Sequence, residues 1–334
     1  MLYNKKREEE LMSTISNLTE YIESDNKNAE LYFKRALNYY QLSQQYYDIF
    51  EIFDGIGDKN LYFRYVNKAY QDVEKAISLK VKEDYAYYFK VFMLKKLKRW
   101  DEVIEYGLKL DDTLGCTSLE YSLIGEAHFN LKNWQKCIDF YTKVINDIGE
   151  KNANHIGVKI FIERGLAYCG IENFELALKD FLKHEELNKS IFDCEIYLLI
   201  ADMYKTLKKY EEAINYYTKL IEIIPEHPIP YFERGKLYCD YLNDYESAVK
   251  DFDKAIEYAE EENYFYYHNC GYAYVHKGEI DENNGNYELA LQDYDRAIEA
   301  YKKAVPLDPT GDDGSYTVGY AQDLKNKLLE KIGK

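Results

Sequence analysis

A short pattern that returns at nearly constant spacing constrains this chain more than any other feature. Glu163-Arg-Gly-Leu-Ala-Tyr168 returns as Glu233-Arg-Gly-Lys-Leu-Tyr238 and, in altered form, as Lys34-Arg-Ala-Leu-Asn-Tyr39. Farther along, an aromatic-x-x-Ala-x-x-x-aromatic stripe recurs at 245–252 and 287–294. Residues three and four apart share one face of a helix. Each unit is therefore expected to be two amphipathic helices, with a small residue where they cross.

The distance between copies gives the length of one unit. The small residues of the second helices lie at Ala69, Val103, Cys137, Ala177, Ala213, Ala248 and Ala290. Their spacings are 34, 34, 40, 36, 35 and 42 residues, which indicates a base period of 34 with insertions. A unit of this length cannot bury its apolar face alone, so neighbouring units are expected to stack around one continuous core. The expected fold class is all-α.

This pattern resembles the tetratricopeptide repeat family. The sixth copy supplies the large, small and aromatic residues of the family pattern at Tyr231, Arg234-Gly235, Tyr238, Ala248, Phe252 and Ala255. The second copy departs from the pattern at Val91 and Gly107, and the third departs from it at His128 and Cys137. The resemblance implies a right-handed α-solenoid, or superhelix, of about seven helix-turn-helix repeats with terminal capping helices.

The copies also predict the organisation of the chain. A starting helix is expected within 1–28 and a capping helix within 306–334. Seven repeats are expected between them, at 29–80, 84–112, 118–148, 158–188, 194–225, 228–260 and 264–305. The last repeat has an insertion at 279–286, and its second helix holds two overlapping registers, Ala290/Tyr294/Ala297 and Ala297/Tyr301/Ala304.

The first repeat carries the largest interruption, at 40–60, which we interpret as an extended hairpin. Helical continuation places Tyr46, Ile49, Phe50 and Phe53 on one face. Either this face folds back on a neighbouring repeat, because exposed aromatic residues usually find cover within their own chain, or it is a protruding interaction patch. The second alternative would allow a homodimer through the 40–60 insertion, since large exposed apolar patches mark binding sites.

The net charge of the chain limits the classes of partner that it can be expected to bind. A formal net charge of -17 argues against binding to nucleic acid, which requires a basic face, and against docking on an anionic membrane. The sequence shows no signal-peptide-like or membrane-spanning apolar stretch, so we expect a cytoplasmic protein. Its six cysteines stand singly, without C-x-x-C spacing, and are expected to be reduced and mostly buried.

No residue pattern indicates catalysis or a bound metal. The acidic stretches 281–285 and 308–314 lack the residue order of a calcium loop, and the histidines lack zinc-site spacing. Phosphate-binding glycine loops and nucleophile elbows are also missing from the sequence. Cys137 and Cys270 fall at packing positions, where burial makes a thiol inert. We expect a chain that is not an enzyme and uses no cofactor.

The resemblance also implies a binding surface, because peptides in this family lie along the concave groove formed by the first helices. Carried onto this sequence, the groove positions include Phe33, Lys34, Tyr85, Tyr88, Phe89, Phe92, Glu126, Lys159, Glu163, Asp202, Phe232, Glu233, Lys236 and Asn269. No three consecutive copies present the lysine and asparagine clamp with which some members hold an acidic chaperone tail. The acidic positions in the groove would instead repel a carboxylate.

These observations predict a non-enzymatic adaptor or scaffold that binds a protein or peptide in its groove. Because the groove has aromatic and acidic positions, the expected partner has apolar anchors and some basic character. The alternative is a regulatory peptide sensor whose superhelix changes conformation when its ligand binds.

Overall fold

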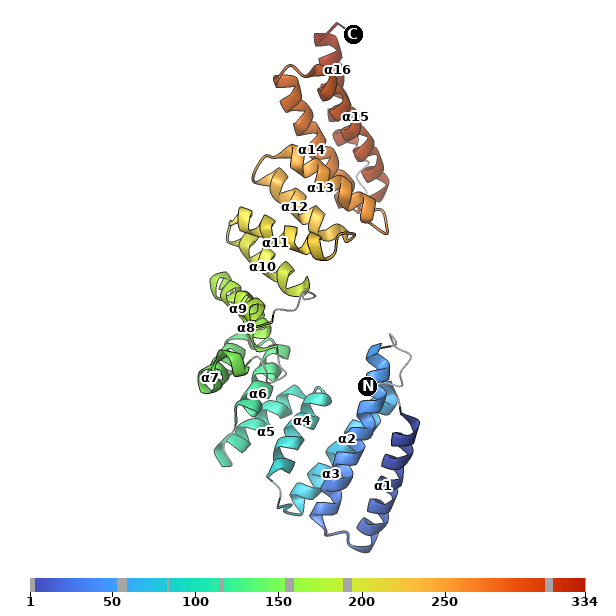
Figure 1. The fold of residues 1–334 in the computed structure, drawn as a ribbon, viewed down its shortest axis with the longest axis vertical. Coiled ribbons are helices and arrows are strands. Elements are labelled where there is room, and N and C mark those ends of the chain that lie inside the picture. Colours follow the sequence, from blue (N-terminus) through green and yellow to red (C-terminus); the bar gives the residue numbers. More distant parts are fainter. Residues whose placement is uncertain are drawn as a thin grey trace. The chain divides into compact units, whose positions relative to one another are not determined.

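The computed structural model describes residues 4–52, 59–82, 84–113, 117–153, 159–188, 194–309 and 315–333, and the regular structure in these ranges is entirely helical. The chain forms two compact units, Met1–Asn173 and Phe174–Lys334, here called the N-terminal and C-terminal units. Figure 1 shows helix hairpins following one another within each unit. The predicted all-α solenoid is confirmed.

The N-terminal unit contains eight helices among its described residues. They are α1 (Lys5–Ser24), α2 (Ala29–Ile52), α3 (Lys59–Ser78), α4 (Tyr85–Lys96), α5 (Trp100–Thr113), α6 (Ser118–Asn130), α7 (Trp134–Ala153) and α8 (Ile160–Gly170). Each helix packs on the next one along the chain. The α2–α3 hairpin is longer than the α4–α5 hairpin that follows it (Figure 1).

The C-terminal unit repeats this arrangement in its own described residues. It consists of α9 (Phe174–Leu187), α10 (Cys194–Thr206), α11 (Tyr210–Ile223), α12 (Pro228–Asp240), α13 (Tyr245–Tyr258), α14 (Tyr264–Asn283), α15 (Tyr287–Ala304), the 3₁₀ turn η1 (Val305–Leu307) and α16 (Ser315–Lys331). From α9 to α16, each α-helix packs on the next.

The crossing positions predicted from the sequence lie at the centre of the core. All seven small residues of the second helices are 0% exposed: Ala69, Val103, Cys137, Ala177, Ala213, Ala248 and Ala290. Glycines on the first helices meet aromatic rings of the second helices. A Cβ added to Gly125 would lie 2.8 Å from the Tyr141 ring, and one added to Gly235 would lie 2.9 Å from the Phe252 ring. The small residues expected where the helices cross are therefore confirmed, and aromatic rings fill the space beside them.

A buried ion pair, which the repeat pattern does not predict, lies beside the helix crossing. In the C-terminal unit, the Arg234 guanidinium donates to both carboxylate oxygens of Asp251 at 2.8 Å and to the Thr218 hydroxyl at 2.9 Å. In the N-terminal unit, Arg35 makes the same contacts with Asp72 and Thr19. Each arginine therefore ties a first helix to the second helices on either side of it.

The equivalence of Thr19 and Thr218 explains the role of α1. Thr218 belongs to α11, the second helix of its hairpin, whereas Thr19 belongs to α1, which precedes the first hairpin. Both hydroxyls accept a hydrogen bond from the arginine of the following helix, at 2.9 and 3.0 Å. Helix α1 therefore packs as a second helix without its partner.

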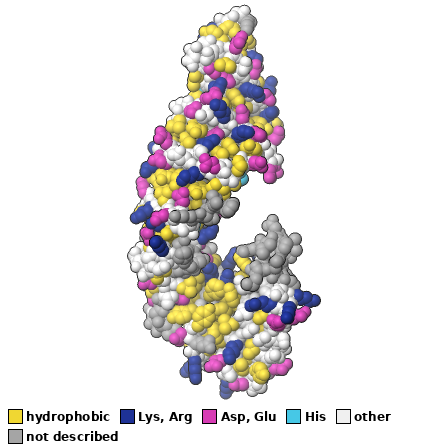
Figure 2. All heavy atoms as spheres, viewed as in Figure 1, with side chains coloured by type: hydrophobic (Ala, Val, Ile, Leu, Met, Phe, Trp, Pro, Cys, Tyr) yellow, Lys and Arg dark blue, Asp and Glu magenta, His cyan; other side chains and the backbone are white. Residues whose placement is uncertain are grey.

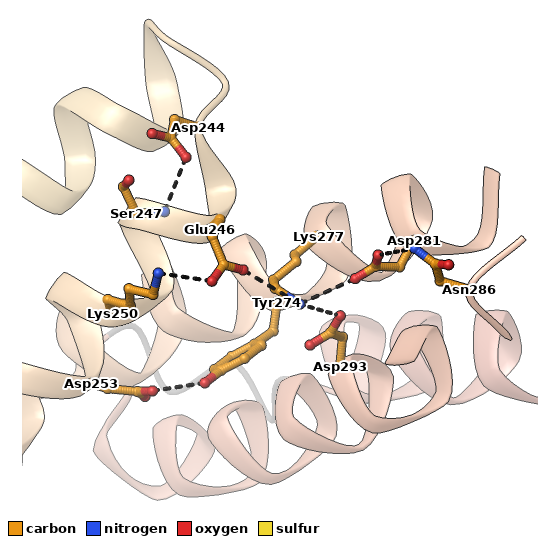
Figure 3. A network of polar contacts seen from close by, with 10 residues as sticks. All are labelled: Asp244, Glu246, Ser247, Lys250, Asp253, Tyr274, Lys277, Asp281, Asn286 and Asp293. Carbon is orange, nitrogen blue, oxygen red and sulfur yellow. Dashed lines mark hydrogen bonds and ion pairs between the residues drawn. The ribbon is translucent and has the colours of Figure 1, made fainter. Parts of the chain in front are cut away.

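The last hairpin shows the pair in altered form (Figure 3). Lys277 of α14 takes the place of the arginine and lies 2.8 Å from Asp293, 3.2 Å from Asp281 and 3.7 Å from Glu246. Like Arg234, Lys277 is followed by a glycine at the helix crossing. A side chain at this position would not fit, because a Cβ on Gly278 would lie 2.8 Å from the Tyr294 ring of α15.

Helix α14 makes a second crossing of the same kind two turns earlier. A Cβ on Gly271 would lie 2.9 Å from the Tyr301 ring of α15. The two registers predicted for the second helix are therefore both occupied. The segment predicted as an insertion does not form a separate loop over its first five residues, because residues 279–283 continue α14.

Five of the six cysteines lie among the described residues, and Cys116 lies outside them. Cys137, Cys239 and Cys270 are buried, while Cys169 and Cys194 are half-buried. Burial raises the pKa of the Cys239 thiol to about 12 and also raises the pKa of the Cys137 thiol. These buried thiols remain protonated and unreactive near neutral pH.

Candidate functional site

The first-helix surface of the N-terminal unit is aromatic where α2 faces α4. Tyr85 lies at the start of α4 and is 60% exposed. Beneath it, Phe33 and Phe89 are only 2% and 3% exposed, with ring centroids 6.0 Å apart. The prediction that these two phenylalanines line the groove is therefore wrong for direct contact, because neighbouring aromatic rings cover them. They support the exposed tyrosine instead.

Other predicted positions on this surface reach solvent. Lys34 is exposed, and Tyr88 and Phe92 are half-buried. The Tyr40 ring meets the Phe92 ring edge-on, with centroids 5.5 Å apart. Figure 2 shows hydrophobic side chains gathered on the surface over α4 and its neighbours. The aromatic character expected for this part of the chain is present, and Tyr85 is its most exposed predicted member.

The acidic character expected for the groove is largely neutralised in the N-terminal unit. Glu126 of α6 forms an ion pair with Lys95 of α4 at 2.6 Å, and both side chains are mostly buried. Lys159, just before α8, is exposed. The expectation that Glu126 repels a ligand carboxylate is corrected, because the lysine beside it cancels its charge.

The carboxylate of Glu163 on α8 is hydrogen-bonded to a side chain of the buried core. The Tyr141 hydroxyl donates a hydrogen bond to its carboxylate, and Tyr141 itself is fully buried. Burial raises the pKa of Glu163 to about 7, and the Glu126 carboxylate contributes to the rise. The Tyr141 hydrogen bond and the charges of Lys95 and Lys159 lower the pKa without reversing this shift. Glu163 therefore changes charge near neutral pH.

Replacing Glu163 by glutamine should remove part of the pH dependence of stability. Between pH 4.5 and 7 the folded state holds a proton that the unfolded state releases, so the wild type loses stability as pH rises through this window. The loss should be about 2 kcal/mol between pH 5 and 8, and Glu163→Gln should not show it. Urea unfolding at both pH values measures the effect.

The exposed Glu20 of α1 supplies the control for this experiment. Glu20→Gln should leave the pH dependence of the wild type unchanged, within about 0.5 kcal/mol. Equal pH dependence in the wild type and in Glu163→Gln would show that Glu163 does not titrate as described.

In the C-terminal unit, a polar network joins α10 to α12. The Lys205 ammonium lies 2.9 Å from Asp202 and 2.8 Å from Glu233, and the Tyr217 hydroxyl donates to Asp202 at 3.0 Å. Lys236 lies 3.9 Å from Glu233. Two of the predicted acidic positions thus converge on one lysine, which the sequence analysis did not include.

The remaining predicted residues of this unit are partly engaged by their neighbours. The half-buried Phe232 ring lies 4.8 Å from the Tyr266 ring, and the amide of Asn269 donates to the backbone carbonyl of Phe265 at 2.7 Å. On α14, the structure exposes two aromatic side chains, Phe265 at 55% and Tyr272 at 43%. Phe265 was left out of the predicted groove positions, although it is the second residue of the repeat expected at 264–305.

The segment predicted as an interaction patch falls mostly outside the described part of the structure. Phe53 and the side chains of Ile49 and Phe50 are not among the described groups. Tyr46 is described and packs inward, because its hydroxyl donates to Glu8 at 2.5 Å and its ring stacks on Tyr65. For this residue, the arrangement matches the alternative in which the face folds back on the chain.

A basic pocket at the end of α4 was missed by the sequence analysis. Its volume is about 320 Å³, and its lining includes the side chains of Lys59, Lys95, Lys96 and Lys98. Three of these lysines fall within four consecutive residues, so that part of the signal was readable. The fourth comes from α3 and joins the cluster only through the fold.

The described residues contain no group of three or more metal-ligating side chains placed to hold an ion. No helix in the described ranges is both long enough and apolar enough to cross a membrane.

Known proteins match this chain through its repeats. The sequence profile of the tetratricopeptide repeat matches residues 195–227, 230–262, 271–302 and 285–310. Small glutamine-rich tetratricopeptide repeat-containing protein 2 of Saccharomyces cerevisiae is 32% identical over 125 residues, which are 37% of this chain and 31% of that protein. A TPR repeat-containing protein of Methanocaldococcus jannaschii is 23% identical over 303 residues, covering 81% of this chain and 51% of that protein.

The fold is also similar to a solved structure, the C-terminal part of a TPR repeat-containing protein from Cytophaga hutchinsonii. The TM-score is 0.58 at 17% identity, covering 78% of this chain and 97% of that one. Stacked helix pairs with small residues at their crossings define an α-solenoid repeat protein. The matched profile identifies tetratricopeptide repeats within residues 195–310 of this chain. It spans about a third to a half of the two curated relatives named above.

Proposed function

We propose that this chain is a non-enzymatic adaptor or scaffold that binds a protein or peptide on the first-helix surfaces of its repeats. Proteins with these repeats generally mediate interactions between proteins. The observation that carries the proposal is Tyr85, which is 60% exposed on α4 above a buried aromatic floor. A tyrosine ring that packs on other rings along one side supplies apolar contact area at a small cost in conformational entropy.

The C-terminal unit supports the same proposal with its own exposed aromatic residues. Phe265 and Tyr272 lie on α14, the first helix of the last hairpin. The same unit holds the polar network around Lys205, so it offers both the apolar anchors and the fixed polar groups that peptide-binding grooves use.

An array of peptides from the host proteome tests this function. Wild-type protein should retain a defined set of peptides, and Tyr85→Ala should lose a large part of that set because the exposed ring is removed. Tyr21→Ala is the matched control, since Tyr21 is a 61% exposed tyrosine on α1 of the same unit. A set that is unchanged in Tyr85→Ala, or lost equally in Tyr21→Ala, would count against binding on the first-helix surface.

A further inference from the structure

The basic pocket of the N-terminal unit lies where the long α2–α3 hairpin extends beside the end of α4. Its lining comes from α2, α3, α4, the start of α5 and α6. At about 320 Å³ it is large enough to receive one or two side chains of a ligand. The pocket is distinct from the exposed surface around Tyr85, because Tyr85 begins α4 whereas Lys95 and Lys96 of the pocket end it.

Aromatic rings form one part of the pocket wall. The Tyr47 ring of α2 lies 5.2 Å from the Tyr62 ring of α3, which lies 5.1 Å from the Phe63 ring. The first residue of α5, Trp100, also lines the pocket. Such a wall favours an apolar side chain, because burying it there removes apolar surface from water on both partners.

Lysines form the other part of the wall. Among the described residues, four lysines and one glutamate, Glu126, line the pocket, and that glutamate is paired with Lys95 at 2.6 Å. The Lys96 ammonium lies over the rings of Tyr47 and Phe92, at 5.6 and 5.3 Å from their centroids. The pocket is thus a concentration of positive charge on a chain with a formal net charge of -17.

We propose that this pocket docks an acidic peptide segment of a partner protein. An apolar side chain of the segment enters between the aromatic rings, and flanking carboxylates pair with Lys96 and Lys98. Charge complementarity favours this ligand, because the lysines of the pocket attract an acidic segment whereas the net charge of the whole chain opposes its approach. A small inorganic anion would leave the aromatic wall uncovered. The inference rests on the proposed peptide-binding function and gives the N-terminal unit a specific ligand class.

Trp100 provides the reporter for a direct test. The chain has only two tryptophans, and Trp100 lines the pocket. The probe is an end-blocked decapeptide of glutamates with two phenylalanines, titrated while tryptophan fluorescence is recorded. Two further peptides define the selectivity: one replaces the phenylalanines by alanine, and the other replaces every glutamate by lysine.

The variant Lys96→Glu/Lys98→Glu reverses the charge of the pocket. Lys98 lies in the turn after α4 with a φ of 56°, and glutamate is compatible with this conformation because Glu172 adopts a φ of 60° at the equivalent turn after α8. Lys132→Glu/Lys136→Glu is the matched control. Lys132 has a φ of 57° at the next such turn, and both control lysines are exposed outside the pocket.

The wild type should bind the glutamate–phenylalanine peptide at least about tenfold more tightly than either of the other peptides. Lys96→Glu/Lys98→Glu should lose this binding by at least about tenfold and gain affinity for the lysine peptide, while the control variant stays within about twofold of the wild type. A gain for the lysine peptide separates charge recognition from misfolding.

Three results would overturn the proposal. The first is equal affinity of wild type and Lys96→Glu/Lys98→Glu for the acidic peptide. The second is equal affinity of the wild type for the phenylalanine and alanine peptides, which would indicate diffuse charge attraction alone. The third is a wild-type dimer that dissociates in the charge-reversal variant, which would identify a second copy of this chain as the occupant. If peptides retained on the array still depend on Tyr85, the general function stands and only the acidic ligand fails.

Discussion

Replacing Arg234 by methionine should lower the free energy of unfolding by about 3–5 kcal/mol. The substitution leaves the Asp251 side chain, which is 7% exposed, without the guanidinium that lies 2.8 Å from it. It also removes the hydrogen bond that the Thr218 hydroxyl accepts at 2.9 Å. A buried carboxylate without a partner costs far more than a lost surface contact, because water cannot replace the missing charge. Urea unfolding followed by circular dichroism measures the loss.

A surface ion pair on α13, the helix that carries Asp251, provides the matched control. Lys250 and Glu246 of α13 lie 2.9 Å apart with 69% and 58% of their side chains exposed. Lys250→Met should therefore change stability by no more than about 0.5 kcal/mol. The double variant Arg234→Met/Asp251→Leu should recover most of the loss, because neither charge stays buried. If Arg234→Met were as mild as Lys250→Met, the buried pair would not hold these helices together.

Enlarging Gly125 to valine should destabilise the N-terminal unit by about 3 kcal/mol, because the crossing of α6 and α7 has no room for a side chain. Even the first added carbon would lie 2.8 Å from the Tyr141 ring. That ring cannot move aside easily, since Tyr141 is fully buried and its hydroxyl is bonded to Glu163. Both tryptophans, Trp100 and Trp134, lie in this unit, so urea unfolding followed by their fluorescence reports on it directly.

Alanine substitutions at two helical glycines separate crowding from helix propensity. Among the described residues, no neighbouring atom lies within 4 Å of a Cβ added to Gly319 of α16, so Gly319→Ala should raise stability by up to about 1 kcal/mol. Gly125→Ala gains the same propensity but meets the Tyr141 ring, and it should lower stability. A stabilising Gly125→Ala would contradict the close crossing.

The core was predictable from the sequence because its signal is local and periodic. The alanines at 177, 213 and 248 recur once per helix-turn-helix repeat, and each is fully buried in the structure. The ion pair between Arg234 and Asp251 was harder to predict from the sequence. Both residues are visible in the repeated motifs, but their contact depends on the rotation of one helix against another, which spacing within a single helix does not give.

The binding surface was predictable only in part, for a related reason. The repeat register correctly places Phe33 and Phe89 on first helices, yet it cannot tell that neighbouring rings cover them. Likewise, Glu126 was read as a free acidic group because Lys95 belongs to a different repeat. Register assigns a residue to a face, whereas exposure and charge depend on the packing of adjacent units.

The most direct test of the central claim, that the first-helix surface binds a peptide, is a titration calorimetry comparison. The ligand is a peptide retained by the wild type on the array. The proposal predicts that Tyr85→Ala weakens its binding by at least about tenfold, while Tyr21→Ala stays within about twofold of the wild type. Equal dissociation constants for the wild type and Tyr85→Ala would contradict the proposed binding surface.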